Sequence, residues 1–326
     1  MRYTNLGRSG LKVSRLGLGT MNFGWQLGED DSHAILDRAL AEGINFVDTA
    51  DMYGARDYEG TSEAYIGSWF ARTGRRDEVV LATKVYQPMG DGPNDRGLSA
   101  RHIVAACEAS LRRLGTDRID LYQMHHVDRG TPWEEIWQAM DVLVAQGKVL
   151  YVGSSNFAGW HLAGAQAAAI RRHSLGLVSE QLKYSLMTRH VELEVVPAAQ
   201  ALGIGLLPWS PLAQGVLSGA LRKHREGAAG RTTSHTAARV LEHRELLERY
   251  EGLCDDLGLH PAVVALAWLL GRPGVTAPIV GPRTPDQLDL ALVALETTLG
   301  DDAESRLNEL FPPVGNGGPG PEAWAW

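Results

Sequence analysis

The chain has 326 residues, 44% of them hydrophobic, which is enough to build one large domain or two medium ones. Its 31 Lys and Arg residues against 39 Asp and Glu residues give a formal charge of −8. This balance argues against a nucleic-acid-binding protein, which would carry a basic face. No apolar run approaches the roughly 18 residues of a membrane span, and the N-terminal MRYTNLGRSG lacks the apolar segment of a signal peptide. We therefore expect a soluble, cytoplasmic protein with no nucleic-acid or membrane partner.

The chain begins with a predicted hairpin, in which Tyr3–Leu6 and Leu11–Val13 flank a turn at Gly7–Gly10. Eight apolar runs of strand length follow, at 15–20, 44–50, 79–85, 119–125, 149–155, 177–184, 203–210 and 277–282. Helical periodicity predicts helices at 31–42, 62–71, 99–114, 132–146, 159–171, 193–202, 261–270 and 284–295.

Alternating strands and helices predict an α/β fold. Each strand–helix unit requires a parallel strand with a right-handed crossover, and eight such units that close on themselves form a (β/α)8 TIM barrel. We predict a single domain over residues 1–326, with a Gly/Pro-rich tail at about 312–326. A doubly wound sheet is the alternative fold. Its G-x-G-x-x-G motif is incomplete here, because Asn22 stands where a third glycine would follow Gly17 and Gly19.

Three segments rich in Gly, Pro and small polar residues interrupt the alternation, at 87–98, 217–237 and 311–326. The first two follow the third and seventh predicted strands, so we expect extended loops that shape a pocket on the catalytic face. The two cysteines, Cys107 and Cys254, lie on apolar helical stripes. We expect them to be buried and unreactive, as suits a reducing compartment.

Ionisable residues occur at three neighbouring strand ends, where TIM barrels place their chemistry. Asp48 ends the second predicted strand and Tyr53 follows it, Lys84 lies in the third, and His125 ends the fourth. These residue types together favour proton donation. We expect Lys84 to lower the pKa of the Tyr53 hydroxyl, Asp48 to keep Lys84 charged, and His125 to orient a substrate oxygen.

A metal site is the alternative chemistry, with His125, His126, Asp48, Asp51 and Asp128 as the candidate ligands. Adjacent histidines on a strand point to opposite faces, and a lysine among the inward residues repels a cation. We therefore expect no metal.

At these residues the chain resembles the aldo-keto reductase superfamily. The resemblance runs from LGRSGLKVSRLGLGTMNFG through FVDTADMYG, LATK, IDLYQMHH, YVGSSN, EQLKYS and LPWSPLAQGVLSG to IVGPRTPDQL. It implies that Asp48, Tyr53, Lys84 and His125 form a catalytic tetrad with Tyr53 as the acid. It also implies NADPH as the hydride donor and a small-molecule carbonyl compound as the substrate.

The resemblance further implies the cofactor contacts. Ser155, Asn156 and Gln181 match residues that hold the nicotinamide carboxamide, and Trp209 matches the aromatic residue that stacks on the nicotinamide ring. The other implied contacts are Thr20, Met21 and Asp48, a pyrophosphate loop of Ser210, Pro211, Leu212, Gln214 and Gly215, and a 2′-phosphate and adenosine site of Gly281, Arg283 and Gln287. Arg283 favours NADP over NAD. Leu290 and Ala291 stand where the family often has an acidic residue and an Asn, which predicts weaker adenine contacts.

The predicted substrate pocket is largely aromatic and suits sugars or aromatic aldehydes. Its walls are Met21, Phe23, Trp25, Tyr86, Met89 and His126. The stretches SARHIVAACEASLRRLG, HHVDRGTPWEEIWQAM and SSNFAGWH resemble bacterial reductases of deoxysugar pathways, which makes NDP-hexose 2,3-enoyl reduction an alternative reaction. A second alternative is a cofactor-sensing regulatory subunit with little turnover, since relatives of the family serve channels. The sequence favours no particular oligomeric state.

Overall fold

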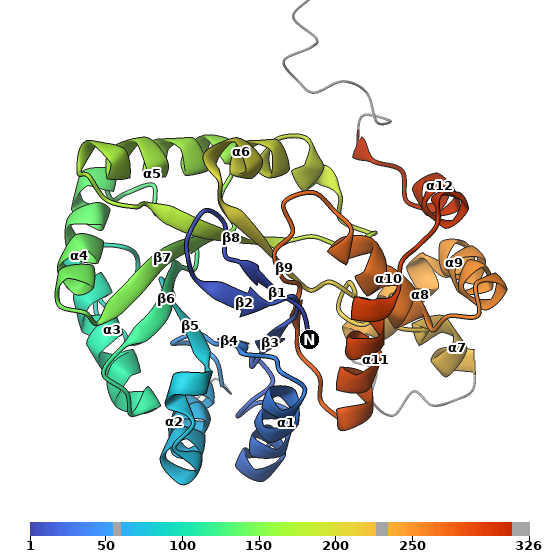
Figure 1. Ribbon diagram of the computed structural model, residues 1–326, viewed down its shortest axis with the longest axis horizontal. Coiled ribbons are helices and arrows are strands. Elements are labelled where there is room, and N and C mark those ends of the chain that lie inside the picture. The colour runs from blue at the N-terminus through green and yellow to red at the C-terminus, as the bar shows by residue number, and fades with distance from the viewer. Residues whose placement is uncertain (55–59, 226–233, 315–326) are drawn as a thin grey trace, which may run out of the picture.

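The computed structural model describes residues 1–54, 60–225 and 234–314, and within them eight parallel strands form a nearly closed barrel (Figure 1). The strands are ordered β10-β3-β4-β5-β6-β7-β8-β9. A backbone bridge between Leu206 and Val275 joins the two ends of this sheet, and the amide of Thr276 donates to Leu206 O at 2.8 Å. The predicted α/β class and (β/α)8 TIM barrel are therefore confirmed.

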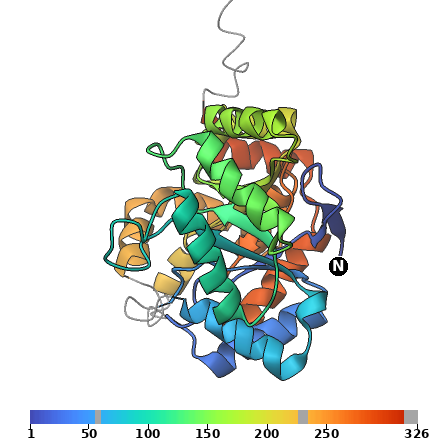
Figure 2. The same ribbon diagram turned by 90° about the vertical axis from the view of Figure 1, so that its left-hand side faces the viewer.

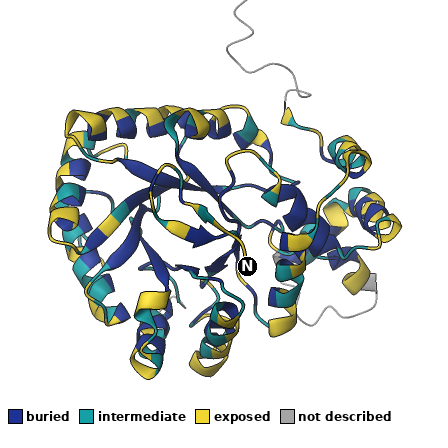
Figure 3. Ribbon diagram, viewed as in Figure 1, coloured by how far each residue is buried: buried dark blue, intermediate teal, exposed yellow. Residues whose placement is uncertain are grey.

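The elements follow the predicted order. The strands are β1 (Tyr3–Asn5), β2 (Lys12–Ser14), β3 (Gly17–Gly19), β4 (Phe46–Asp48), β5 (Val80–Val85), β6 (Ile119–Met124), β7 (Val149–Ser155), β8 (Leu177–Lys183), β9 (Gly205–Trp209) and β10 (Ile279–Val280). The surrounding helices are α1 (Glu29–Ala41), α2 (Thr61–Thr73), α3 (Ala100–Leu114), α4 (Trp133–Ala145), α5 (Gly159–Arg171), α6 (Val195–Leu202), α10 (Pro261–Leu270) and α11 (Pro285–Glu296). Figure 3 shows that the barrel strands are mostly buried and that the surrounding helices expose their outer faces.

The β1–β2 hairpin covers the amino-terminal end of the barrel, which faces the viewer in Figure 1. Leu6 and Val13 from this hairpin are fully buried and belong to the core cluster inside the barrel. Gly7 has a φ of 55°, and a Cβ there would lie 2.4 Å from Val178 O, so the turn requires glycine. The predicted hairpin is confirmed.

Because side chains alternate between the two faces of a strand, the inward positions that follow this core carry polar side chains at the carboxyl end of the barrel. Phe46, Ala82 and Leu121 belong to the cluster inside the barrel. Two residues further along the same strands stand Asp48, Lys84 and Gln123. Because side chains two apart on a strand share a face, these three polar groups point into the barrel at its carboxyl end.

The eighth barrel strand is shorter than predicted. The sequence pattern predicts a strand over 277–282, but only Ile279 and Val280 pair with β3. Pro278 and Pro282 flank this pair, and proline has no N–H with which to continue the ladder.

The segment 217–237 is partly helical, which corrects the prediction of a loop. It contains α7 (Ala220–Arg225) and the start of α8 (Ser234–Glu242), while 226–233 lie outside the described residues. Leu221 and Val240 are buried, and Glu251 accepts hydrogen bonds from the amides of Leu221 and Arg222. Apolar burial and this cap explain α7 despite the glycine-rich sequence that follows it.

The helices α9 (Arg244–Asp256) and α12 (Asp301–Leu310) were not predicted; Figure 1 shows them with α7 and α8 on one side of the barrel. No single helix in the described residues is long and apolar enough to cross a membrane. Only the pair of α9 and α10, bent by 86°, has the required length and composition. The predicted loop 87–98 contains no helix or strand, and Figure 2 shows it at the end of the barrel opposite the hairpin. Of the predicted tail, residues 315–326 lie outside the described part.

Candidate active site

Side chains from three neighbouring strand ends meet around Lys84 on β5. Lys84 is fully buried, and its Nζ donates to Asp48 Oδ2 at 2.7 Å and to the Tyr53 hydroxyl at 3.1 Å. A third bond from Nζ reaches Thr49 O at 2.8 Å. The His125 ring meets the Tyr53 ring edge-on, with 5.9 Å between the ring centroids. The fold thus brings together the four residues predicted to form the tetrad.

Two glutamines hold the second oxygen of Asp48. Asp48 is buried, and its Oδ1 accepts from Gln123 Nε2 at 2.9 Å and from Gln181 Nε2 at 2.8 Å. A buried carboxylate needs such partners besides its counter-ion. Sequence reasoning missed Gln123. Leu121, Gln123 and His125 are two residues apart on an otherwise apolar strand, so they share its inward face, and this pattern could have identified Gln123.

Burial and the lysine act in opposite directions on the tyrosine. Burial raises the pKa of Tyr53 above its ordinary 10.0, and the opposing effect of Lys84 is smaller. Lys84 thus lowers this pKa as predicted, but burial outweighs its effect and the net shift is upward. For Lys84, burial would lower the pKa, but Asp48 and Tyr53 raise it above 10.5. The site holds a protonated phenol against a fixed ammonium, which suits proton donation.

The His125 imidazole is neutral at physiological pH. Burial lowers its pKa to about 3, and the neighbouring Lys84 and His126 act in the same direction. Within the described residues, its Nδ1 is buried and has no hydrogen-bond partner. A neutral imidazole carries one N–H donor, so His125 can donate a hydrogen bond to an oxygen placed beside Tyr53.

The residues predicted to hold a nicotinamide carboxamide border this cluster. Asn156 follows β7 with a φ of 59°, and its Nδ2 donates to Ser155 Oγ at 3.0 Å and to His125 O at 3.3 Å. Its Oδ1 accepts from Trp209 Nε1 at 3.1 Å. The backbone N–H of Asn156 donates to Gln181 O at 2.9 Å, which holds the turn against β8.

The loop predicted to bind a pyrophosphate has an unusual backbone. Ser210, Ala213 and Gln214 have φ values of 55°, 50° and 61°, and Gly215 has a φ of 89°. Left-handed residues in a tight turn direct neighbouring N–H groups to one side, which favours anion binding. The backbone chemistry therefore fits an anionic ligand.

Contacts from the protein hold this loop in place. Pro211 is buried and Leu212 packs against the core, while Gln214 is exposed. Arg239 of α8 donates to Ala213 O at 3.1 Å and to Gln214 Oε1 at 3.3 Å. The helix that corrects the loop prediction thus supports the predicted pyrophosphate loop.

The predicted 2′-phosphate site lies between β10 and α11. The amide of Arg283 donates to Gln287 Oε1 at 2.8 Å, and its guanidinium donates to Gln26 Oε1 at 3.3 Å. An alternative is that Arg283 only forms a surface ion pair, for example with Asp286. Within the described residues its side chain bonds to the neutral Gln26 and to no carboxylate, so its charge is available to an anion.

Gly281, two residues before Arg283, is exposed, and its carbonyl accepts from Asn22 Nδ2 at 3.1 Å. Leu290 and Ala291 of α11 pack against the core cluster. They therefore offer apolar packing where the family often has polar groups.

The predicted residues after β3 divide into two groups. Met21 and Trp25 are 52% and 54% exposed, and are free to contact ligands. Phe23 is fully buried in the core, so its assignment to a pocket wall is wrong; its side chain fills space beneath the loop. Thr20 is also fully buried, and its hydroxyl bonds to Asp48 O and to Ser62. The buried Thr20 side chain therefore stabilises the backbone at Asp48 from within the protein.

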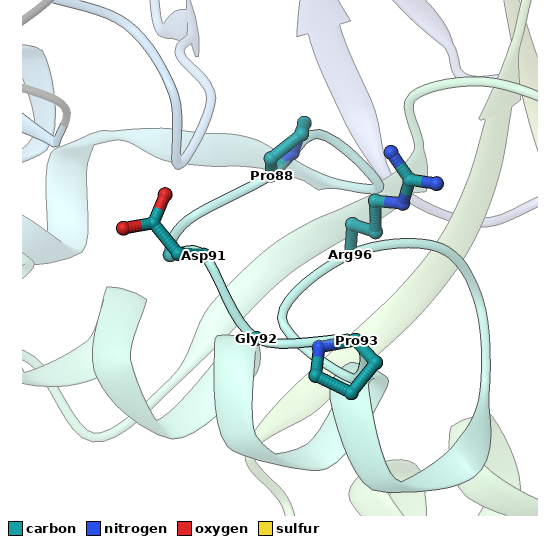
Figure 4. A pocket seen from close by; sticks show the side chains of 6 residues that line it. Pro88, Asp91, Gly92, Pro93 and Arg96 are labelled. Carbon is teal, nitrogen blue, oxygen red and sulfur yellow. The ribbon is translucent and has the colours of Figure 1, made fainter.

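The loop after β5 forms the side of the site near His126. The Tyr86 ring packs on the His126 ring at a tilt of 36°, with centroids 5.4 Å apart, and the amide of Gly97 donates to Tyr86 O at 2.7 Å, which closes the loop. Met89 is half-buried within it. The loop lines a cavity of about 470 Å³. Asp91 and Arg96 are among the lining side chains that Figure 4 shows.

Comparison with known proteins identifies the family to which this chain belongs. The sequence profile described as "Aldo/keto reductase family" matches residues 15–311. This chain belongs to the aldo/keto reductase family. It is thus related to oxidoreductases along nearly its whole length, as the resemblance implied.

Three relatives of this aldo/keto reductase illustrate the range of the family. The chain is 54% identical to "Uncharacterized oxidoreductase YrpG" of Bacillus subtilis, over 100% of both chains. It is 36% identical to "Versiconal hemiacetal acetate reductase" of Aspergillus parasiticus, over 96% of this chain and 98% of the relative. It is 37% identical to "Probable voltage-gated potassium channel subunit beta" of Arabidopsis thaliana, over 91% and 92%.

Two of the candidate metal ligands of this aldo/keto reductase have other partners, whereas both Asp51 oxygens and His125 Nδ1 are buried without a hydrogen-bond partner in the described residues. Asp48 pairs with Lys84, and Asp128 accepts from the amides of Leu98 and Gly130 at 2.8 and 2.9 Å. Burial and the neighbouring Glu63 raise the pKa of Asp51 well above its usual range. In the described part of the chain, no three His, Cys, Asp or Glu side chains are grouped so as to hold a metal ion.

Proposed function

We propose that this protein is an NADPH-dependent reductase of aldehydes or ketones, sugar-like ones included, with Tyr53 as the general acid. The observation that carries the proposal is the 3.1 Å hydrogen bond from Lys84 to Tyr53, made by an ammonium that is itself held by Asp48 at 2.7 Å. When bound, NADPH supplies the hydride.

The chain's own residues supply the proton and hold the oxygen. His125, neutral because burial lowers its pKa to about 3, donates a hydrogen bond to the carbonyl oxygen. Tyr53 transfers its hydroxyl proton to that oxygen as negative charge develops there. The Lys84 ammonium stabilises the resulting phenolate, and Asp48 keeps the ammonium charged and in place.

The residues around the cluster fit the cofactor. Asn156 and Gln181 lie beside the tetrad with amide groups, and the Trp209 indole is fixed by its bond to Asn156. The left-handed loop that starts at Ser210 suits a pyrophosphate, and Arg283 suits a 2′-phosphate.

Replacing Arg283 with Ala should weaken NADPH binding by about 10- to 100-fold and leave NADH binding nearly unchanged. A charge-assisted bidentate bond contributes about 1.5–3 kcal/mol, and about 1.4 kcal/mol corresponds to a factor of ten. A ribose hydroxyl offers no equal charge to the guanidinium. Fluorescence titration of both cofactors against both proteins measures the effect. Equal losses for NADPH and NADH would exclude a 2′-phosphate role.

The pH profile of reduction should have no acidic limb from His125. Its pKa of about 3 keeps the imidazole neutral across the neutral range. We expect kcat/KM for a simple aldehyde to stay constant within about two-fold between about pH 5 and pH 7. A limb near the ordinary histidine pKa that is present in the wild type and absent in His125→Asn contradicts this assignment.

A turnover assay separates the proposal from its alternatives. A relative named as a probable potassium channel subunit is compatible with the regulatory alternative. NADPH consumption is measured with a panel of aldehydes, ketones and α,β-unsaturated carbonyl compounds. Consumption with carbonyls supports the reductase, reduction of only the unsaturated bond supports an enoyl reductase, and binding without consumption supports a sensor.

A further inference from the structure

Glu180 is a fully buried carboxyl group behind the candidate active site. It precedes Gln181 on β8, and its relative exposure is 0%. Since Gln181 points into the barrel to Asp48, alternation places Glu180 on the opposite face of the strand. There it lies opposite Ser154 of β7 in the strand register.

Both oxygens of Glu180 bond to the segment 154–157, which comprises the last two residues of β7 and the turn after them. Oε1 accepts from the amide of Phe157 at 2.8 Å, and Oε2 lies 2.5 Å from Ser154 Oγ. Ser154 Oγ in turn lies 3.4 Å from Ser179 O. One buried carboxyl therefore joins both ends of the segment 154–157.

Asn156, inside this turn, connects the parts of the site. Its φ of 59° is a conformation that non-glycine residues adopt at a cost, so surrounding contacts must hold it. From that position its amide group bonds to His125 O and to the Trp209 indole. Any relaxation of the turn moves Asn156 away from both.

We propose that Glu180 is a positioning residue. From the outward face of β8 it holds the segment 154–157 in place, and so keeps Asn156 in position to bind the nicotinamide carboxamide. The inference rests on the proposed NADPH-dependent function. Glu180 itself touches neither the tetrad nor the open face of the barrel, so it acts through Asn156.

The Glu180 carboxyl group is neutral at physiological pH. Burial raises the pKa of Glu180 to about 8, against the smaller opposing effects of Ser154 and the amides of Phe157 and Asn156. Its hydrogen-bond partners in the described residues are Ser154 and the Phe157 amide, and the nearby α5 histidine, His161, accepts from the Ala158 amide at 3.1 Å. A neutral carboxyl donates its proton to Ser154 Oγ, which is then free to donate to Ser179 O.

Above about pH 8 this arrangement changes. The ionised carboxylate only accepts, so the Ser154 hydroxyl must donate to Glu180 and give up Ser179 O. A buried unpaired charge then sits beneath the turn. We expect the turn to hold Asn156 less well, and NADPH affinity to fall as pH rises through this value.

The test compares wild type, Glu180→Gln and Glu180→Leu by NADPH titration between about pH 6 and pH 9, with kcat and KM measured alongside. Gln keeps an acceptor for the Phe157 amide and a donor for Ser154, so it should match wild type near pH 6 and lack the alkaline loss of affinity. Leu should raise the dissociation constant and KM for NADPH about 10-fold at every pH, which corresponds to about 1.4 kcal/mol, and change kcat less.

Asp120→Asn is the matched control. Asp120 is also a buried carboxylate that accepts a backbone amide, from Leu81 at 2.8 Å, but it lies near the start of β6, away from the site, and it also pairs with Arg76 at 2.8 Å. It should lower the thermal midpoint and leave NADPH affinity unchanged.

The outcomes separate the inference from the proposed function. If Glu180→Leu behaves like the control, or if Glu180→Gln keeps the alkaline loss, the positioning role is overturned. If the Leu variant does not fold, the pH profile of the Gln variant decides. Wild-type protein that binds no NADPH at any pH overturns the proposed function and this inference with it.

Discussion

Replacing Tyr53 with Phe should lower the rate of carbonyl reduction by about 100- to 10,000-fold and leave NADPH affinity within about two-fold of wild type. The substitution keeps the ring that meets His125 edge-on and deletes the hydroxyl that accepts from Lys84 at 3.1 Å. Positioning of the cofactor therefore persists while the proton donor is lost. Single-turnover rates with a simple aldehyde, together with a fluorescence titration, measure the two effects separately.

Tyr122→Phe is the control for this substitution. Tyr122 is another buried tyrosine, and its hydroxyl donates to Ile103 O at 3.3 Å in the helix layer, away from Lys84. Its loss should reduce stability without reducing turnover. A Tyr53→Phe enzyme that reduces aldehydes at near wild-type rates contradicts the assignment of the acid.

The barrel and the candidate site were predictable because they depend on local patterns. Asp48, Lys84 and His125 lie at or near the ends of apolar runs of strand length, and parallel strands bring such ends to one edge whatever the helices do. The predicted helix at 159–171 has the bounds of α5. Periodicity placed these residues at one end of the barrel, and the resemblance implied their role as a tetrad.

The features that the sequence did not predict depend on burial and on contacts between residues far apart in the chain. Phe23 follows the first barrel strand like the exposed Met21 and Trp25, and only tertiary packing distinguishes it. The cap that Glu251 provides to α7 joins residues about thirty positions apart, which periodicity does not detect. The direction of the Tyr53 pKa shift needed the extent of burial, which no motif states.

Glu180 illustrates the same limit at the site. In sequence it is the first residue of EQLKYS, and only its neighbour Gln181 was assigned a role. Its importance depends on a register that sets it against Ser154 and on a turn that closes over it. Such partners come from β7, and only the folded barrel brings them together.

Replacing Lys84 with Met should lower reduction by about 100- to 1,000-fold, as expected for the loss of one preorganised charge beside a developing anion. It should also change the pH profile in a defined direction. Reduction requires a protonated Tyr53, so the rate falls as pH rises through the pKa of that hydroxyl. Burial raises this pKa and Lys84 opposes the rise, so removing Lys84 raises it further. The basic limb of kcat/KM should therefore move to higher pH.

Stability must be separated from chemistry in this variant, because Met leaves Asp48 buried without its counter-ion. The two glutamine donors to Oδ1 remain, but breaking a buried ion pair commonly costs about 3–5 kcal/mol. The double variant Lys84→Met with Asp48→Asn removes both charges and should recover much of the lost stability. It should not recover activity, since the phenolate still lacks an ammonium. A pH profile that keeps its shape in both variants, despite normal folding, would show that Lys84 only packs and leaves the acidity of Tyr53 unchanged.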